Sequence, residues 1–299
     1  MPQKQQNPTV EKNYIREPAV AGAFYDGDAE SLRKTVEQFI NNAKDVEVPG
    51  KLIGIVSPHA GYIYSGSVAG YSYKQIMGRK YKTVIVLAPS HRARFPGVSV
   101  IPCGKYKTPL GEVSIDEEMA KKIMARDSNS FNFIEQAHSN EHSLEVQVPF
   151  LQVALGEGWK IVPIVYGTPD VKTCSMVSEA IAANYAPEDL LIVASTDMSH
   201  YHPYDIAREK DRKCIDLITH MDLEGLASSL GQRESELCGM GPVITMMILT
   251  SALGGSAKEL KYANSGDTAG TESEVVGYAS IAFYTEKKLE LKKTGSEHE

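Results

Sequence analysis

Three short apolar runs in this chain each end in a polar loop that carries a histidine. The runs and their histidines are Leu52–Val56 with His59, Val84–Leu87 with His91, and Leu190–Ala194 with His200. A short apolar run that stops at a proline or a polar cluster predicts a buried strand. Ligands of α/β proteins bind outside the carboxyl ends of such strands. The three strand ends are therefore predicted to aim the histidines at one point.

The rest of the chain alternates predicted strands with predicted helices. Such an alternation predicts an α/β fold with a mixed central sheet and helices on both faces. The last strand alternates small and large apolar residues without charge, which indicates a place inside the sheet. The predicted helices are 29–43, 67–77, 117–124, 141–155, 171–184, 206–221, 223–230 and 241–253, and the other strands are 98–101, 160–165, 259–264 and 275–283.

The chain is expected to form one domain. Its 299 residues show no internal repeat and no clear linker, and α/β domains often reach this size. We predict a disordered lead-in at 1–14, a single domain at 15–285 and a charged tail at 286–299. Pro149 lies inside the predicted helix at 141–155, so a kink or a late start is expected there.

Composition excludes several classes of protein. A net charge of -7 argues against nonspecific nucleic-acid binding, which needs a basic surface. No stretch reaches the roughly 18 apolar residues of a membrane span. The four cysteines are far apart and no secretory signal precedes them, which predicts reduced thiols in a cytoplasmic protein.

Histidines at strand ends are candidate metal ligands, because neutral imidazole is the commonest ligand in proteins. Asp197 precedes His200 by three residues, and its carboxylate could orient a histidine or touch a metal. No short spacing such as HExxH connects His59, His91 and His200. The evidence for a metal site is that all three occur in equivalent settings.

Two further segments carry candidate residues. His142 lies in Glu141-His142-Ser143-Leu144-Glu145 at the predicted start of a helix, where His138, His142 and Glu145 would share one face. Cys238 lies in Cys238-Gly239-Met240-Gly241-Pro242, directly before a predicted helix. A helix N-terminus lowers the pKa of a thiol, so this cysteine is predicted to be a nucleophile or a metal ligand.

These residues leave two chemistries open. A Cys238–His pair with Asp197 would support acyl transfer. A mixed cluster of histidine, cysteine and aspartate would instead favour a redox-capable or Lewis-acid metal. Neither a GxGxxG nor a Walker loop is present, so nucleotide chemistry has no support.

Taken together, six segments resemble the Memo family, whose microbial members are often called AmmeMemoRadiSam system protein B. The resemblance extends from about Arg16 to Tyr284. The segments are Gly22-Ala23-Phe24-Tyr25, Ser57-Pro58-His59-Ala60-Gly61-Tyr62, Ala88-Pro89-Ser90-His91, Glu141-His142-Ser143-Leu144-Glu145, Ser195-Thr196-Asp197-Met198-Ser199-His200 and Cys238-Gly239-Met240-Gly241-Pro242.

The resemblance implies a fold like that of class III extradiol (LigB-type) dioxygenases, with metal ligands at His59, His91 and Cys238. It places His200 where the dioxygenases keep an acid/base histidine, and it makes Asp197 a further pocket residue. Cys238 stands where the dioxygenases have a carboxylate. A thiolate would favour copper or ferrous iron over harder metals and leaves ring cleavage open.

The leading hypothesis is a metal-dependent oxidoreductase-like protein that binds Fe(II) or Cu, with His200, Asp197 and His142 as its catalytic and supporting residues. The rival is a non-catalytic scaffold whose pocket binds a peptide or a protein partner. A Cys/His hydrolase is a third reading. The family name suggests a radical-SAM pathway partner. The substrate, a small molecule or a peptide, and the oligomeric state are not encoded in these motifs.

Overall fold

The computed structural model describes residues 11–168, 170–270 and 272–286. Most of the predicted lead-in, and the predicted tail after Glu286, lie outside these residues. Residues 11–14 lie against the segment that follows Cys103, where the carbonyl of Tyr14 accepts the N–H of Lys105 at 2.9 Å.

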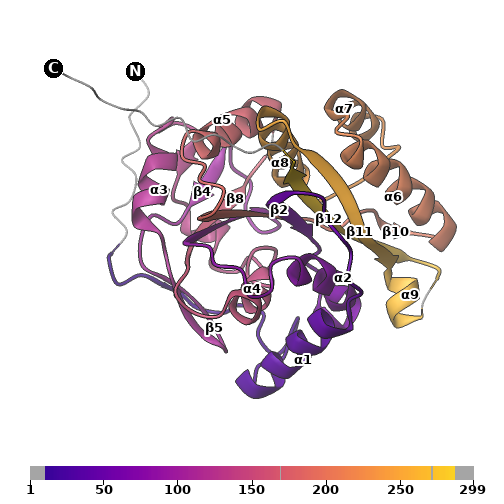
Figure 1. Ribbon diagram of the computed structural model, residues 1–299, viewed down its shortest axis with the longest axis horizontal. Helices are drawn as coiled ribbons and strands as arrows, with labels where there is room; N and C mark the ends of the chain where they lie inside the picture. Colours follow the sequence, from indigo (N-terminus) through magenta and orange to yellow (C-terminus); the bar gives the residue numbers. More distant parts are fainter. Residues whose placement is uncertain (1–10, 169, 271, 287–299) are drawn as a thin grey trace.

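A nine-stranded mixed sheet forms the centre of the fold (Figure 1). Its middle strands β2, β9, β3 and β8 are parallel, while β12 and β4 run antiparallel to their neighbours on the two sides. The strands in sheet order are β10 (His200–His202), β12 (Val275–Thr285), β2 (Lys51–Ser57), β9 (Leu190–Ser195), β3 (Thr83–Pro89), β8 (Lys160–Tyr166), β4 (Val98–Val100) and β7 (Phe131–Asn132), with β11 (Ser256–Asn264) also paired to β12.

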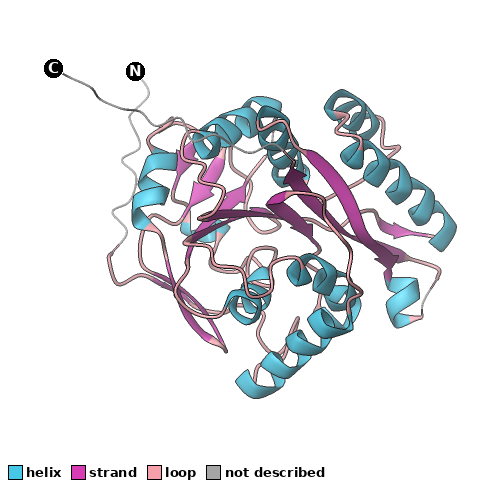
Figure 2. Cartoon of the chain, in the orientation of Figure 1, coloured by secondary structure: helices cyan, strands magenta, loops and turns pink. Residues whose placement is uncertain are grey.

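Helices cover both faces of this sheet, as predicted (Figures 1 and 2). Successive side chains of a strand point to opposite faces, so β3 contributes Val84 and Val86 to one core and Ile85 and Leu87 to the other. The first face carries α1 (Ala29–Asn42), α2 (Tyr62–Lys74) and α4 (Gln147–Leu155), and the second carries α3 (Glu117–Met124), α5 (Val171–Ala182), α6 (Tyr204–Thr219), α7 (Leu223–Gly231) and α8 (Met240–Ala252).

Strand β12 lies inside the sheet, as its uncharged alternation predicted. It pairs with β11 on one side and with β2 on the other. Strands β7 and β10 and a small second sheet were not predicted from the sequence. That sheet contains β1 (Ile15–Arg16), β5 (Lys105–Thr108) and β6 (Gly111–Ser114). The short elements η1 (Glu135–Ala137) and α9 (Ser265–Ala269) complete the described chain.

One helix starts earlier than predicted, and another has the late start that the sequence indicated. Helix α2 begins at Tyr62, directly after the loop of His59, and the Tyr62 hydroxyl donates to the carbonyl of Val146 at 2.6 Å. Helix α4 begins only at Gln147, the late start that Pro149 predicted, since proline fits the first helical turn. His142 therefore lies in a loop, and the prediction that it shares a helix face with His138 and Glu145 is wrong.

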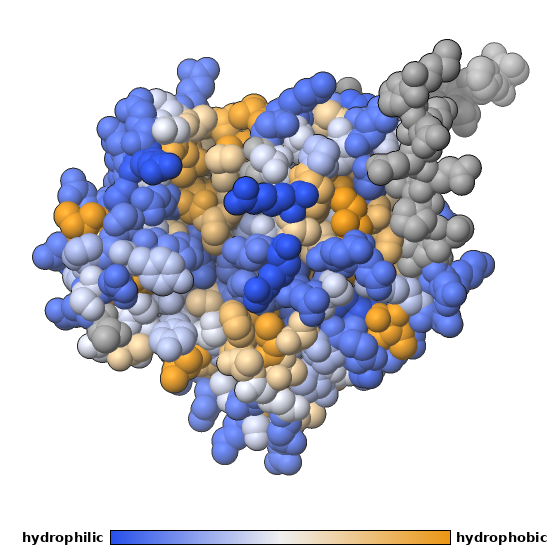
Figure 3. All heavy atoms as spheres, turned by 180° about the vertical axis from the view of Figure 1, so that it is seen from behind, coloured by the Kyte–Doolittle hydropathy of each residue, from blue (hydrophilic) through white to orange (hydrophobic). Residues whose placement is uncertain are grey.

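The surface is mainly hydrophilic, as expected for a chain rich in polar and charged residues (Figure 3). On the face seen in Figure 3, hydrophobic side chains form separate patches among hydrophilic ones. Within the part of the chain that the structure describes, no helix is both long and apolar enough to cross a membrane.

Candidate metal centre

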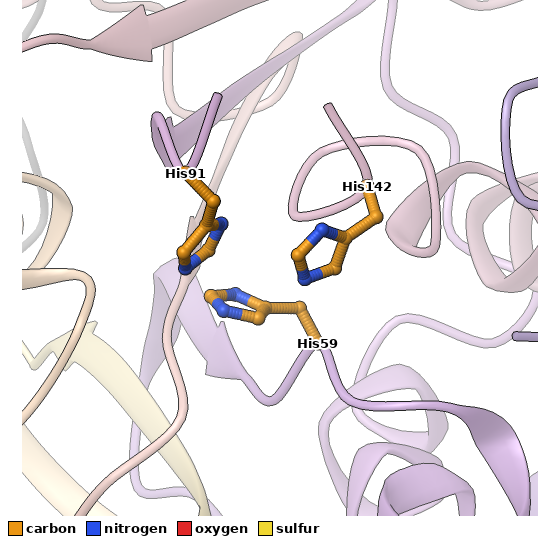
Figure 4. A group of neighbouring side chains, drawn as sticks. All are labelled: His59, His91 and His142. Atoms are coloured by element: carbon orange, nitrogen blue, oxygen red, sulfur yellow. The ribbon is translucent and has the colours of Figure 1, made fainter. Parts of the chain in front are cut away.

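Three histidines gather at the carboxyl ends of the parallel strands (Figure 4). His59 follows β2 and His91 follows β3, while His142 comes from the loop before α4. One ligand nitrogen from each lies within 4.8 Å of the other two. The rings of His91 and His142 stack at 4.7 Å between centroids, and His59 meets both edge-on. The spacing of this His59/His91/His142 cluster is compatible with a metal site.

The hydrogen bonds of Ser195 fix the tautomer of His59. The Ser195 hydroxyl donates to the carbonyl of Ser143 at 2.6 Å, so it has no proton left for His59. The 2.9 Å contact between its Oγ and His59 Nδ1 must then be donated by the ring. His59 Nε2 is consequently unprotonated, which is the form of imidazole nitrogen that binds a metal.

The carboxylate of Glu141 orients His91 in the same way. Burial alone would raise the pKa of Glu141, but hydrogen bonds from His91 and Ser143 lower it to about 2. The ionised carboxylate only accepts, so the 2.9 Å contact with His91 Nδ1 is donated by the ring. A second carboxylate oxygen accepts the His91 backbone N–H. His91 Nε2 is left as the ligand atom, the arrangement that carboxylates impose on metal-bound histidines.

His142 is held by its backbone rather than by its ring. Its N–H donates to Glu141 at 2.9 Å, and its ring packs against Phe24 at 4.8 Å between centroids. The buried Nδ1 atom lies 3.3 Å from Glu141 but makes no hydrogen bond with the described residues. Burial lowers the pKa of His142 to about 4, so the ring is neutral near pH 7. An unsatisfied buried nitrogen in this cluster is what a missing ligand would leave.

Cys238 lies beside this cluster and touches one of its members. Its Sγ is 3.1 Å from His59 Nε2, and it also accepts the N–H of Asp197 at 3.2 Å. Burial raises the pKa of the Cys238 thiol, so the prediction of a lowered thiol pKa is wrong. The favourable field at the start of α8 does not offset the loss of water around a thiolate. Since burial lowers the pKa of His59, the neutral thiol donates to a neutral ring.

Asp197 and His200 follow β9 at the same edge of the sheet. The Asp197 carboxylate accepts the backbone N–H of His59 at 2.7 Å, which ties the ends of two neighbouring strands together. Burial raises the pKa of Asp197 to about 7. Asp197 touches the backbone of His59 and leaves its ring to Ser195. The described residues therefore do not form the Cys238–His–Asp197 arrangement considered for acyl transfer.

The cluster opens into a cavity of about 630 Å³. His200 also lines it, and burial lowers the pKa of this histidine. Cys238 instead lines a second cavity of about 450 Å³, which shares only His200 with the first. The histidine cluster and the thiol therefore line different cavities, although Cys238 Sγ contacts His59 Nε2.

Sequence reasoning missed the residues that hold this site in shape. Glu141 and Ser195 were read only as parts of motifs, although a carboxylate next to a histidine is a usable signal. Glu145 is a structural residue. Its buried carboxylate forms an ion pair with Arg16 and accepts the N–H of Ala19 at 2.8 Å, which fastens the N-terminal segment to the loop of His142. His138 lies apart from the cluster and contacts Ser99.

Comparisons with known proteins find relatives over most of the chain. A family model described as Memo-like protein matches residues 16–282. Three relatives are MEMO1 family proteins of archaea. They are those of Methanopyrus kandleri (40% identical over 279 residues, 90% of this chain and 98% of the relative), Sulfurisphaera tokodaii (40% over 283 residues, 90% and 99%) and Ignicoccus hospitalis (41% over 281 residues, 90% and 98%).

Proposed function

The chain belongs to the Memo family, and from this premise we propose that it is a metal-dependent, oxidoreductase-type protein that binds iron or copper. His59 and His91 hold the ion, and Cys238 supplies a thiolate as the third ligand. His142 adds a further nitrogen donor from the same cluster. The observation that carries this proposal is that Ser195 and Glu141 fix both rings with Nε2 unprotonated, as a metal ligand requires.

The donor set supports a soft or borderline metal. Imidazole suits iron, copper and zinc, while a thiolate favours copper(I) or ferrous iron over magnesium or calcium. Cys238 Sγ already lies against His59 Nε2 at 3.1 Å, so both atoms border the same point. The neutral rings of His59 and His142 need to lose no proton to become ligands.

The bound ion would supply a Lewis acid and a redox centre at the floor of the cavity. The side chains around it would handle protons. Asp197 has a pKa raised to about 7, so it exists in both protonation states at neutral pH and can give or take a proton. His200 lines the same cavity and is the proposed acid/base group toward a ligand bound there.

Metal analysis of purified protein tests this proposal. Protein prepared without chelators, or reconstituted with Fe(II) without oxygen or with copper, is expected to retain one ion per chain. His59→Ala and His91→Ala should abolish retention, whereas Cys103→Ala, a cysteine outside the site, should not change it. Absence of a tightly bound iron or copper ion under both conditions would refute the proposal and favour the non-catalytic scaffold.

The pH dependence of affinity identifies the third ligand. If Cys238 binds, its protonated thiol must release a proton, and affinity should rise about tenfold per pH unit below the thiol pKa. If only the histidines bind, affinity should be nearly flat between pH 7 and 8. Cys238→Ser should remove the slope in the first case and change nothing in the second. A flat profile in the unsubstituted protein would exclude the thiolate ligand.

A further inference from the structure

The outer part of the histidine-lined cavity differs from its floor. Its exposed lining includes two tyrosines, Tyr64 and Tyr201. Among the residues that the structure describes, the hydroxyls of Tyr64 and Tyr201 have no hydrogen-bond partner, and both side chains are exposed, at 43% and 72%. The other two aromatic residues of the lining lie deeper: Phe24 packs against His142, and Tyr278 is buried.

Tyr201 is placed at this opening by an irregularity of the backbone. It has a positive φ of 60°, in a region that large side chains rarely adopt. The pairing of β10 with β12 shifts register between His200 and His202, so Tyr201 is the extra residue of a bulge. Bulges re-aim side chains, and strained residues of this kind persist mainly at functional sites. The fold thus presents a large aromatic ring to solvent beside His200.

Among the residues that line the cavity, the acidic side chains have no basic counterpart. Its described lining contains the carboxylates of Asp197 and Glu274 and neither lysine nor arginine. Asp197 is occupied by the backbone N–H of His59. Glu274 is exposed and forms no ion pair or side-chain hydrogen bond with the described residues. An unpaired carboxylate beside exposed aromatic faces attracts cations and repels anions.

We propose that the outer cavity binds an organic cation, a protonated amine or quaternary ammonium group, held by Tyr64, Tyr201 and Glu274. Aromatic faces bind such groups through their negative quadrupole, and a carboxylate adds a direct charge interaction. The remainder of the ligand extends inward to the histidines. That it meets a metal there rests on the proposed function, whereas recognition of the ammonium group does not.

Three matched probes test the charge preference. Phenethylamine, 2-phenylethanol and 3-phenylpropionate share a phenyl ring and a two-carbon chain but end in a cation, a neutral group and an anion. Their dissociation constants can be measured by ligand-observed NMR titration of the metal-free full chain at low salt. We expect the amine to bind about tenfold more tightly than the alcohol, and the carboxylate to bind most weakly.

Matched variants locate the binding. Glu274→Gln should weaken amine binding about threefold to tenfold and leave the alcohol unchanged. Glu272→Gln, an exposed neighbour outside the cavity lining, should affect neither probe. Tyr201→Leu should weaken amine binding, whereas Tyr201→Phe, which keeps the ring, should retain it. Each comparison changes one feature of the proposed cation site.

Several results would overturn this inference. They are the absence of saturable amine binding, equal binding of the three probes, tightest binding of the carboxylate, or equal effects of Glu274→Gln and Glu272→Gln. Repeating the titration after metal analysis separates the two proposals. A protein that binds the amine but retains neither iron nor copper after reconstitution with each metal would refute the proposed function and leave the cation site standing. Metal retention without amine preference would do the reverse.

Discussion

Replacement of Glu141 by glutamine should damage both the stability of the fold and its metal site. The carboxylate is buried and accepts four N–H groups, from the backbone of His91, His142 and Ser143 and from His91 Nδ1. A glutamine side chain offers one oxygen and one NH₂ group. At least one of the four N–H groups would therefore face the NH₂ group of the glutamine, and no water could accept its hydrogen bond in this buried site.

The pKa of Glu141 gives the size of the effect. Lowering it from 4.5 to about 2 corresponds to about 3 kcal/mol of stability. Because the folded-state pKa is the lower one, this contribution is fully present above about pH 4.5 and is lost as the pH falls toward about 2. We therefore expect Glu141→Gln to lose about 3 kcal/mol at pH 7, with a smaller difference at pH 3.5.

Urea unfolding followed by circular dichroism measures the loss, and competition with a chelator measures metal affinity. Affinity should fall about 10-fold to 100-fold, because the tautomer of His91 is no longer fixed. Glu118→Gln is the control, since its exposed pair with Lys122 should contribute less than about 1 kcal/mol. A Glu141→Gln protein within the error of the control in both assays would refute this reasoning.

Three other substitutions test separate parts of the structure. Asp197→Asn should remove a pH dependence of stability in the metal-free protein. Because the pKa of Asp197 is raised in the folded state, the unsubstituted protein should lose up to about 4 kcal/mol of unfolding free energy, relative to the variant, as the pH rises from about 4 to 7. Urea unfolding at both pH values measures this loss. Arg16→Met should cost about 3–5 kcal/mol in the same assay, because Glu145 stays buried without its partner, and a loss below 1 kcal/mol would contradict this. Gly70→Ala should lower the melting temperature, at a cost of about 1–3 kcal/mol, because a Cβ atom would overlap the carbonyl oxygen of Phe39 and push α1 away from α2; an unchanged melting temperature would show that this contact is looser.

The sheet was predictable because its strands are bounded by clear signals. Val84–Leu87 and Leu190–Ala194 are continuous apolar runs that stop at polar loops, and buried parallel strands have this pattern. The hairpin of β5 and β6 was missed, since each strand has only four residues, few of them apolar, and two prolines precede it. Three-residue β10 was missed because its pairing with β12 depends on tertiary contacts and contains a bulge.

Two of the three clustered histidines, His59 and His91, were predictable, whereas His142 rather than the expected His200 completes the cluster, and the electrostatics of the site were not predictable. His59 and His91 could be predicted because each follows a continuous apolar run, which is typical of a buried strand. The pKa of Cys238 was misjudged, since a helix N-terminus is visible in a sequence while the exclusion of water around a thiol is not. The grouping of His142 with these histidines depends on a loop path that no periodicity encodes.

The segment Glu141–Glu145 shows why the motif has its composition. Glu141 fixes the ring of His91, and His142 enters the cluster. The carbonyl of Ser143 accepts a hydrogen bond from the Ser195 hydroxyl, whose oxygen then accepts the N–H of the His59 ring. Glu145 pairs with Arg16 and fastens the N-terminal segment, whose Phe24 packs on His142. Glu141 and Ser195, which need not contact a metal, thus determine which nitrogen of His91 and of His59 is left to bind it. A search for this site by ligand residues alone would therefore find the histidines and miss the groups that make them ligands.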